Sequence, residues 1–362
     1  MHGALVLYKA SAPGSLLLLG EYAVLHGKMA VVCAIDKRII VTIEPRRDNR
    51  IHIHSSLGTW SGLLEDLVRQ PPLDFVLEAL VSKKQALLSG CHIHIEAEFS
   101  SDIGLGSSAA VTVALMSALN QWLSQEPVTK EQLWQQVKAV ISLVQGNGSG
   151  ADIAASIYGG VIAFRSAPFY IASLQNHPPL CAVYSGKKTT TAKAIEIVRQ
   201  RYTQNPQHFD RLFEHLDTIS QQGVDAIHRE DWESLGRLFT EAQEQMNQLG
   251  VTDTALSDII QTLHQQPTIF GAKISGSGLG DCAIGLGFLE KALFPNLLIN
   301  GMCLSVIESL FPSTKSFPSS TAFTSFGISS ATYCPSASIW TIISAFISIA
   351  FFISVLKVSA RP

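Results

Sequence analysis

The sequence predicts an α+β protein built from both strands and helices. Three observations lead to this prediction: strand-like runs of β-branched residues, apolar residues at helical spacing, and glycine-rich loops between these segments. With 362 residues, of which 47% are hydrophobic, the chain can bury a sizeable core in one large domain or two ordinary ones.

Strands dominate the first hundred residues. Residues 4–8 and 30–44 are rich in β-branched side chains, and residues 92–99 alternate as a half-buried strand does. The next two segments have the helical period. One carries Val111, Leu115, Leu119 and Trp122, and the other spans residues 129–145.

The second half mixes the same elements in a different order. Short apolar strands are predicted at 159–164 and 180–185, and the charged stretch 191–265 predicts several helices. Residues 268–287 predict a strand, a glycine loop, and then a helix or a strand. Two adjacent prolines favour a domain boundary near residues 175–185.

Composition excludes several classes of protein. A net charge of −3 gives no basic face for nucleic acid. The six cysteines form no CxxC pair, which indicates neither a zinc site nor a disulfide framework. No basic stretch precedes an apolar run at the N-terminus, so we expect no secretory signal and a cytoplasmic location.

The stretch SSDIGLGSSAAV, residues 100–111, is the first candidate site. Small residues let a backbone approach a ligand closely, and Ser107 or Ser108 could cap a helix beginning at Ala109. The free N–H groups and the dipole of such a helix bind anions, so the stretch predicts a phosphate cradle. It is not a Walker A loop, because no Gly-Lys-Ser/Thr follows. A plain strand-to-helix turn is the alternative for this loop taken alone.

Three further stretches accompany it: ASAPGSLLLLGEYAVLHG (10–27), GNGSGADIAASIYGG (146–160) and KISGSGLGDCAIGLG (273–287). In this order and spacing, over roughly residues 8–290, the chain resembles the GHMP kinases. The resemblance implies an α+β fold of two domains with the active site between them. We place these domains at residues 1–180, which would bind ATP, and 181–300.

The resemblance also implies site residues, with ATP and Mg²⁺ as cofactors. Asp152 would be catalytic, because an attacking hydroxyl must be oriented or deprotonated. A helix cap after Gly150 is the alternative for this residue. Ser108 would reach the metal ion. The cofactor-binding residues would be Gly104, Leu105, Gly106, Ser107, Ser108 and Ala109, and the substrate-binding residues Glu21, Tyr22, Ser149, Lys187, Ser277 and Gly278.

The motif details point to the mevalonate pathway. The segment SGSGLGDC (275–282) is closer to phosphomevalonate kinases, so mevalonate 5-phosphate is the favoured acceptor and mevalonate the alternative. A related decarboxylase and an inactive nucleotide-binding relative stay open. Beyond this small molecule we expect no nucleic-acid partner, and a homodimer is left open.

Two positions depart from the family pattern. Ser15 stands where the family usually has lysine, and Ile141 where mevalonate kinases carry a metal-binding glutamate. The missing glutamate argues against a typical mevalonate kinase. Lys9, Lys28 or Lys187 could take over from the missing lysine.

Two other features lie outside these motifs. His52 with His54 and His92 with His94 form His-x-His pairs, which we interpret as exposed strand residues rather than metal ligands. Residues 301–362 are rich in serine, phenylalanine and isoleucine, with an apolar segment at 339–358. We favour a reading-frame change for this tail over a membrane anchor.

Overall fold

A seven-stranded sheet organises the first half of the chain. In the computed structural model, which describes residues 6–124, 126–146 and 148–289 and three short strands between 298 and 307, its strand order is β4-β3-β5-β2-β6-β7. The seventh strand, β1, pairs antiparallel with β2. The strands are β1 (Tyr8–Leu19), β2 (Ala30–Pro45), β3 (Arg50–Ser55), β4 (Gly58–Leu63), β5 (Cys91–Ala97), β6 (Val161–Ser166) and β7 (Phe169–Leu174).

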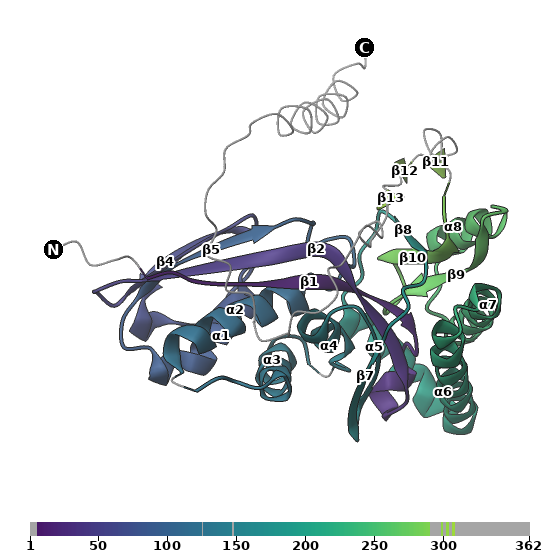
Figure 1. The fold of residues 1–362 in the computed structure, drawn as a ribbon, viewed down its shortest axis with the longest axis horizontal. Coiled ribbons are helices and arrows are strands. Elements are labelled where there is room, and N and C mark those ends of the chain that lie inside the picture. The colour runs from purple at the N-terminus through teal and green to yellow at the C-terminus, as the bar shows by residue number, and fades with distance from the viewer. Residues whose placement is uncertain are drawn as a thin grey trace, which may run out of the picture. The chain divides into compact units, whose positions relative to one another are not determined.

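Helices cover one face of this sheet (Figure 1). They are α1 (Asp74–Lys83), α2 (Ser107–Leu123), α3 (Lys130–Gln145) and α4 (Ala151–Tyr158). Both α2 and α4 contact β1 and β2, while α1 and α3 pack on α2. The start of α3 confirms the predicted helix at 129–145: Thr129 and Gln132 form a reciprocal capping box.

A second, antiparallel sheet follows, with the order β13-β8-β10-β9. It contains β8 (Leu180–Tyr184), β9 (Ile269–Ser275), β10 (Cys282–Gly287) and β13 (Val306–Ile307), while β11 (Leu298–Ile299) pairs with β12 (Met302–Cys303). The charged stretch forms α5 (Thr191–Gln204), α6 (Pro206–His228), α7 (Trp232–Leu249) and α8 (Thr254–His264), as predicted. Both α7 and α8 pack on β9.

Two predictions about local structure were wrong. The first strand begins at Tyr8 and runs to Leu19, through a segment whose one glycine and one proline suppress the strand signal. Helix α2 begins at Ser107 instead of Ala109, and its N-cap is Gly106 with φ 66°, without a side-chain cap. Serine hydroxyls therefore do not compete for the first N–H groups of this helix.

The four histidines meet on neighbouring strands. Because β3 and β5 run parallel in this register, His52 lies beside His92 and His54 beside His94, with ring centroids 5.0 and 5.2 Å apart. Within the described part of the chain, no group of three or more His, Cys, Asp or Glu side chains is arranged to hold a metal ion.

The apolar tail segment at 339–358 lies outside the described residues. Among the helices that the structure does describe, none combines the length and apolar character needed to cross a membrane.

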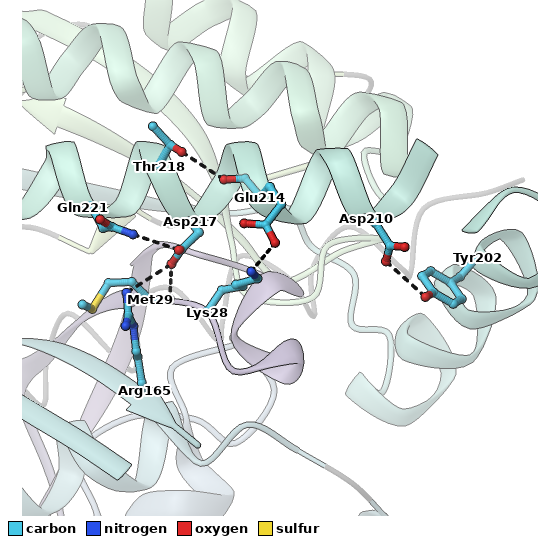
Figure 2. Close-up of polar contacts among 9 residues, drawn as sticks. All are labelled: Lys28, Met29, Arg165, Tyr202, Asp210, Glu214, Asp217, Thr218 and Gln221. Atoms are coloured by element: carbon cyan, nitrogen blue, oxygen red, sulfur yellow. Dashed lines mark hydrogen bonds and ion pairs between the residues drawn. The ribbon is translucent and has the colours of Figure 1, made fainter. Parts of the chain in front are cut away.

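Asp217 of helix α6 makes partly buried polar contacts with the edge region of the large sheet (Figure 2). Asp217 Oδ1 accepts a hydrogen bond from the Met29 backbone N–H at 2.6 Å and lies 3.7 Å from Arg165 Nη2. Gln221 Nε2 donates to the other carboxylate oxygen at 2.8 Å. One side chain of α6 thus contacts both the residue that precedes β2 and a residue of β6.

We expect Asp217→Ala to lower the free energy of unfolding by about 1–3 kcal/mol, because the Met29 N–H loses its acceptor in a partly buried place. Urea denaturation measures this. Glu214→Ala is the matched control on the same helix, since Glu214 pairs with Lys28 but is 67% exposed, and such pairs contribute about 0–1 kcal/mol. Equal losses in both variants would contradict the role of Asp217.

Candidate active site

A cavity of about 590 Å³ collects the sequence motifs. Residues on both sides of position 180 line it, from β1, α2 and α4 to the loop between β9 and β10. The position of the boundary at 180 stays a prediction. What the cavity can bind follows from three groups of side chains around it.

The glycine loop before α2 forms one wall. Gly104 and Gly106 have φ of 72° and 66°, left-handed values that other residues rarely adopt. Because Gly106 caps α2 without a side chain, the first N–H groups of the helix stay free. All six residues predicted to hold the cofactor line the cavity. The wall therefore suits an anion at the positive end of a helix dipole.

Asp152 lies in the first turn of α4 and is open to the cavity. The N-cap of α4 is Gly150, so the carboxylate does not cap its helix. Burial among protein atoms raises the pKa of Asp152 above its ordinary value, while a hydrogen bond from Ser15 lowers it. The carboxylate is thus free to accept a proton from a ligand.

Ser15 stands at the junction of the loop and the carboxylate. Its Oγ donates a hydrogen bond to Asp152 Oδ1 at 2.9 Å, and its backbone N–H donates to the Leu105 carbonyl at 3.0 Å. A Cβ on Gly106 would lie 2.2 Å from this Oγ, so only glycine fits there. Ser15 therefore fixes Asp152 relative to the phosphate loop. Of the three lysines proposed to replace the missing lysine, Lys28 pairs with Glu214 instead.

The loop after β1 forms the opposite wall with β9. Tyr22 OH donates to the Ser277 carbonyl at 2.6 Å. Glu21 forms a fully buried ion pair with Lys273, whose ammonium also donates to the Ile274 carbonyl. Burial raises the pKa of Glu21 and lowers that of Lys273. Sequence reasoning missed Lys273, although a lone lysine inside an apolar strand was a usable signal.

The remaining predicted substrate residues divide into two groups. Ser149 and Ser277 line the cavity, as do Glu21 and Tyr22. Lys187 and Gly278 are not among the lining residues: the Lys187 carbonyl accepts the Asp281 N–H at 2.8 Å, and Gly278 packs on the Val251 carbonyl. Lys188, one residue further on, lines the cavity in place of Lys187. Ile141 also lines it and supplies no metal ligand.

Two family models match this chain. The model of the GHMP kinases N terminal domain matches residues 73–160, and that of the GHMP kinases C terminal matches residues 224–292. A mevalonate kinase of Archaeoglobus fulgidus is 34% identical over 283 residues, covering 78% of this chain and 93% of the relative. The chain belongs to the GHMP kinase family.

Solved structures of this family share the fold. The Methanococcus jannaschii mevalonate kinase superposes with a TM-score of 0.69 at 20% identity, covering 85% of this chain and 98% of that one. A Streptococcus pneumoniae phosphomevalonate kinase in complex with phosphomevalonate and AMPPNP superposes with a TM-score of 0.65 at 19% identity, covering 79% and 93%. This GHMP kinase is accordingly an ATP-dependent small-molecule kinase.

Proposed function

We propose that this GHMP kinase transfers the γ-phosphoryl group of ATP to mevalonate. The observation that carries the proposal is the joint position of Asp152 and the free N-terminus of α2 on one cavity. This reverses the order of the two acceptors that the sequence motifs favoured. Two archaeal relatives that are 34% and 29% identical to this chain bear the name mevalonate kinase.

The charge of the cavity supports mevalonate over its 5-phosphate. Among the described lining residues the basic side chains are Lys138 and Lys188, whereas the acidic ones are Glu21, Asp74, Asp152 and Asp281. A phosphate on the acceptor would add about −1.5 to −2 charges beside the nucleotide. The acceptor with a single carboxylate therefore meets less repulsion.

In the proposed mechanism each wall has one task. The free N–H groups of α2 hold the phosphates of ATP, and Asp152 accepts the proton of the attacking hydroxyl or orients it. Glu21, Tyr22 and Ser277 shape the acceptor side. Mg²⁺, when bound, neutralises charge on the phosphate oxygens, with Ser108 as a proposed ligand. The Oδ1 atom of Asp281, which is buried on this cavity without a hydrogen-bond partner, supports a cation there.

The acceptor is tested by ADP release from Mg-ATP with each candidate. We expect kcat/KM for mevalonate to exceed that for mevalonate 5-phosphate at least roughly tenfold, which corresponds to about 1.4 kcal/mol. Faster turnover of mevalonate 5-phosphate would restore the acceptor that the motifs favoured. Release of CO₂ would indicate the decarboxylase, and nucleotide binding without ADP release the inactive relative.

Ser15 gives the proposal a pH signature. Asp152 must be deprotonated to act, so activity falls as the pH drops through its raised pKa. Ser15→Ala removes the hydrogen bond that lowers this pKa, and we expect the acid limb of the pH–rate profile to move to higher pH.

Ser156→Ala is the matched control, because the buried Ser156 hydroxyl donates to the Pro13 carbonyl and not to Asp152. Its acid limb should stay with that of the wild type. A profile of Ser15→Ala that coincides with both would show that Ser15 does not act on the carboxylate.

A further inference from the structure

Asp281 is a buried carboxylate that the mechanism above leaves without a task. It is 8% exposed and lines the cavity. Its Oδ1 receives no hydrogen bond from any described residue. Buried carboxylate oxygens are normally paired, so a free one on a binding cavity points to a ligand that completes it.

The backbone holds this side chain in place. Asp281 has φ 61°, its N–H donates to the Lys187 carbonyl at 2.8 Å, and its carbonyl accepts the Ser185 N–H at 2.8 Å. A Cβ on Gly104 would lie 2.6 Å from Asp281 Cβ and 3.0 Å from its Oδ1. The carboxylate therefore lies against the first glycine of the phosphate loop.

The charge of Lys188 compensates the Asp281 carboxylate only in part. Burial raises its pKa to about 6, a nearby Lys188 lowers this pKa, and the charge of Asp152 raises it. The Lys188 ammonium donates a hydrogen bond to the Ser101 carbonyl and none to Asp281 Oδ1. Nucleotide phosphates on the same loop would add further negative charge to this end of the cavity.

We propose that Asp281 is a carboxylate ligand of the divalent cation that accompanies the nucleotide, at the Gly104 end of the phosphate loop. This rests on the proposed ATP-dependent function. Mg²⁺ in such sites is held by one or two carboxylates together with substrate phosphates and water. Asp281 borders the place where phosphates would lie and has the free oxygen that coordination needs.

Asp281→Asn separates this role from a merely structural one. Asparagine has the same shape, tolerates positive φ, and removes the charge. With Mg²⁺ present, the variant loses a metal ligand and should bind a non-hydrolysable ATP analogue more weakly than the wild type. In EDTA it loses only a repelling charge, so it should bind the analogue equally well or more tightly. A residue that only shapes the loop would change both affinities in the same direction.

The experiment is calorimetry of the full chain with the analogue, in Mg²⁺ and in EDTA. We expect the enhancement of affinity by Mg²⁺ to fall at least roughly tenfold in Asp281→Asn, since even the partners of metal ligands contribute 10–100-fold to metal affinity. Mn²⁺ bound to the complex, followed by electron paramagnetic resonance, should decrease in parallel. Asp102→Asn removes the same charge from an exposed residue near the loop and should keep the enhancement.

Each outcome has one meaning. An undiminished Mg²⁺ enhancement in Asp281→Asn, beside a wild type that binds the analogue, overturns the proposal for Asp281 alone. A wild-type chain that binds the analogue in neither condition refutes the proposed function and this inference with it. We expect Asp281→Asn to fold. Because burial raises the pKa of Asp281, the stability that this carboxyl contributes is present at low pH and is lost as the pH rises through about 6. The melting temperature of the variant at pH 7.5 should therefore equal or exceed that of the wild type.

Discussion

Replacing Asp152 with asparagine is expected to lower turnover by roughly 10²–10⁴-fold, the usual range for a positioned acid–base group. The amide keeps the shape of the side chain but accepts no proton, and the phosphate loop on the neighbouring wall is untouched. Affinity for the ATP analogue should therefore change little. Steady-state ADP release and calorimetry on the same preparation measure both quantities.

Thermal unfolding controls for damage to the fold. The raised pKa of Asp152 means that its contribution to stability is present at low pH and is lost as the pH rises through that pKa. At neutral pH, Asp152→Asn should consequently melt at the same temperature as the wild type or higher. A folded variant with near-normal turnover would remove Asp152 from the mechanism.

The largest loss of stability is expected from Lys273→Met. This change leaves the Glu21 carboxylate fully buried without its counter-charge, and breaking such a pair lowers the free energy of unfolding by about 3–5 kcal/mol. The double variant Lys273→Met/Glu21→Leu should recover much of this loss, since it leaves no buried charge. Urea denaturation of the single and double variants tests both statements.

The exposed pair Arg199–Glu196 on α5 is the control for that experiment. Arg199→Met should change stability far less than Lys273→Met, because water solvates both partners. A loss in Lys273→Met no greater than in this control would show that the buried pair does not fasten β9 to the loop after β1.

Local sequence patterns predicted most of the helices and strands. They also predicted two parts of the cavity lining, the glycine loop before α2 and the start of α4. The period of 129–145 and the alternation of 92–99 act within a few residues, and both gave the right element. The start of α2 was misplaced because serine usually caps helices, whereas a left-handed Gly106 does so here. The strand signal of β1 was hidden by the small residues and proline that let the loop and α4 approach it.

Contacts between distant residues could not be predicted. Lys273 pairs with Glu21 across 252 positions, and Ser15 reaches Asp152 across 137. The choice of Lys188 over Lys187 depends on which way one short loop turns, and the sequence showed only two adjacent lysines. Asp281 was quoted within a motif, but its role depends on its approach to Gly104, which only the fold brings about.

We propose that phosphoryl transfer to mevalonate occurs at Asp152. The most direct measurement incubates the wild type and Asp152→Asn with mevalonate and ATP labelled with ¹⁸O in the γ-phosphate, followed by mass spectrometry. We predict phosphorylated mevalonate carrying the label with the wild type and only a trace with the variant. Labelled inorganic phosphate without phosphorylated mevalonate, or equal product from both proteins, would contradict this mechanism.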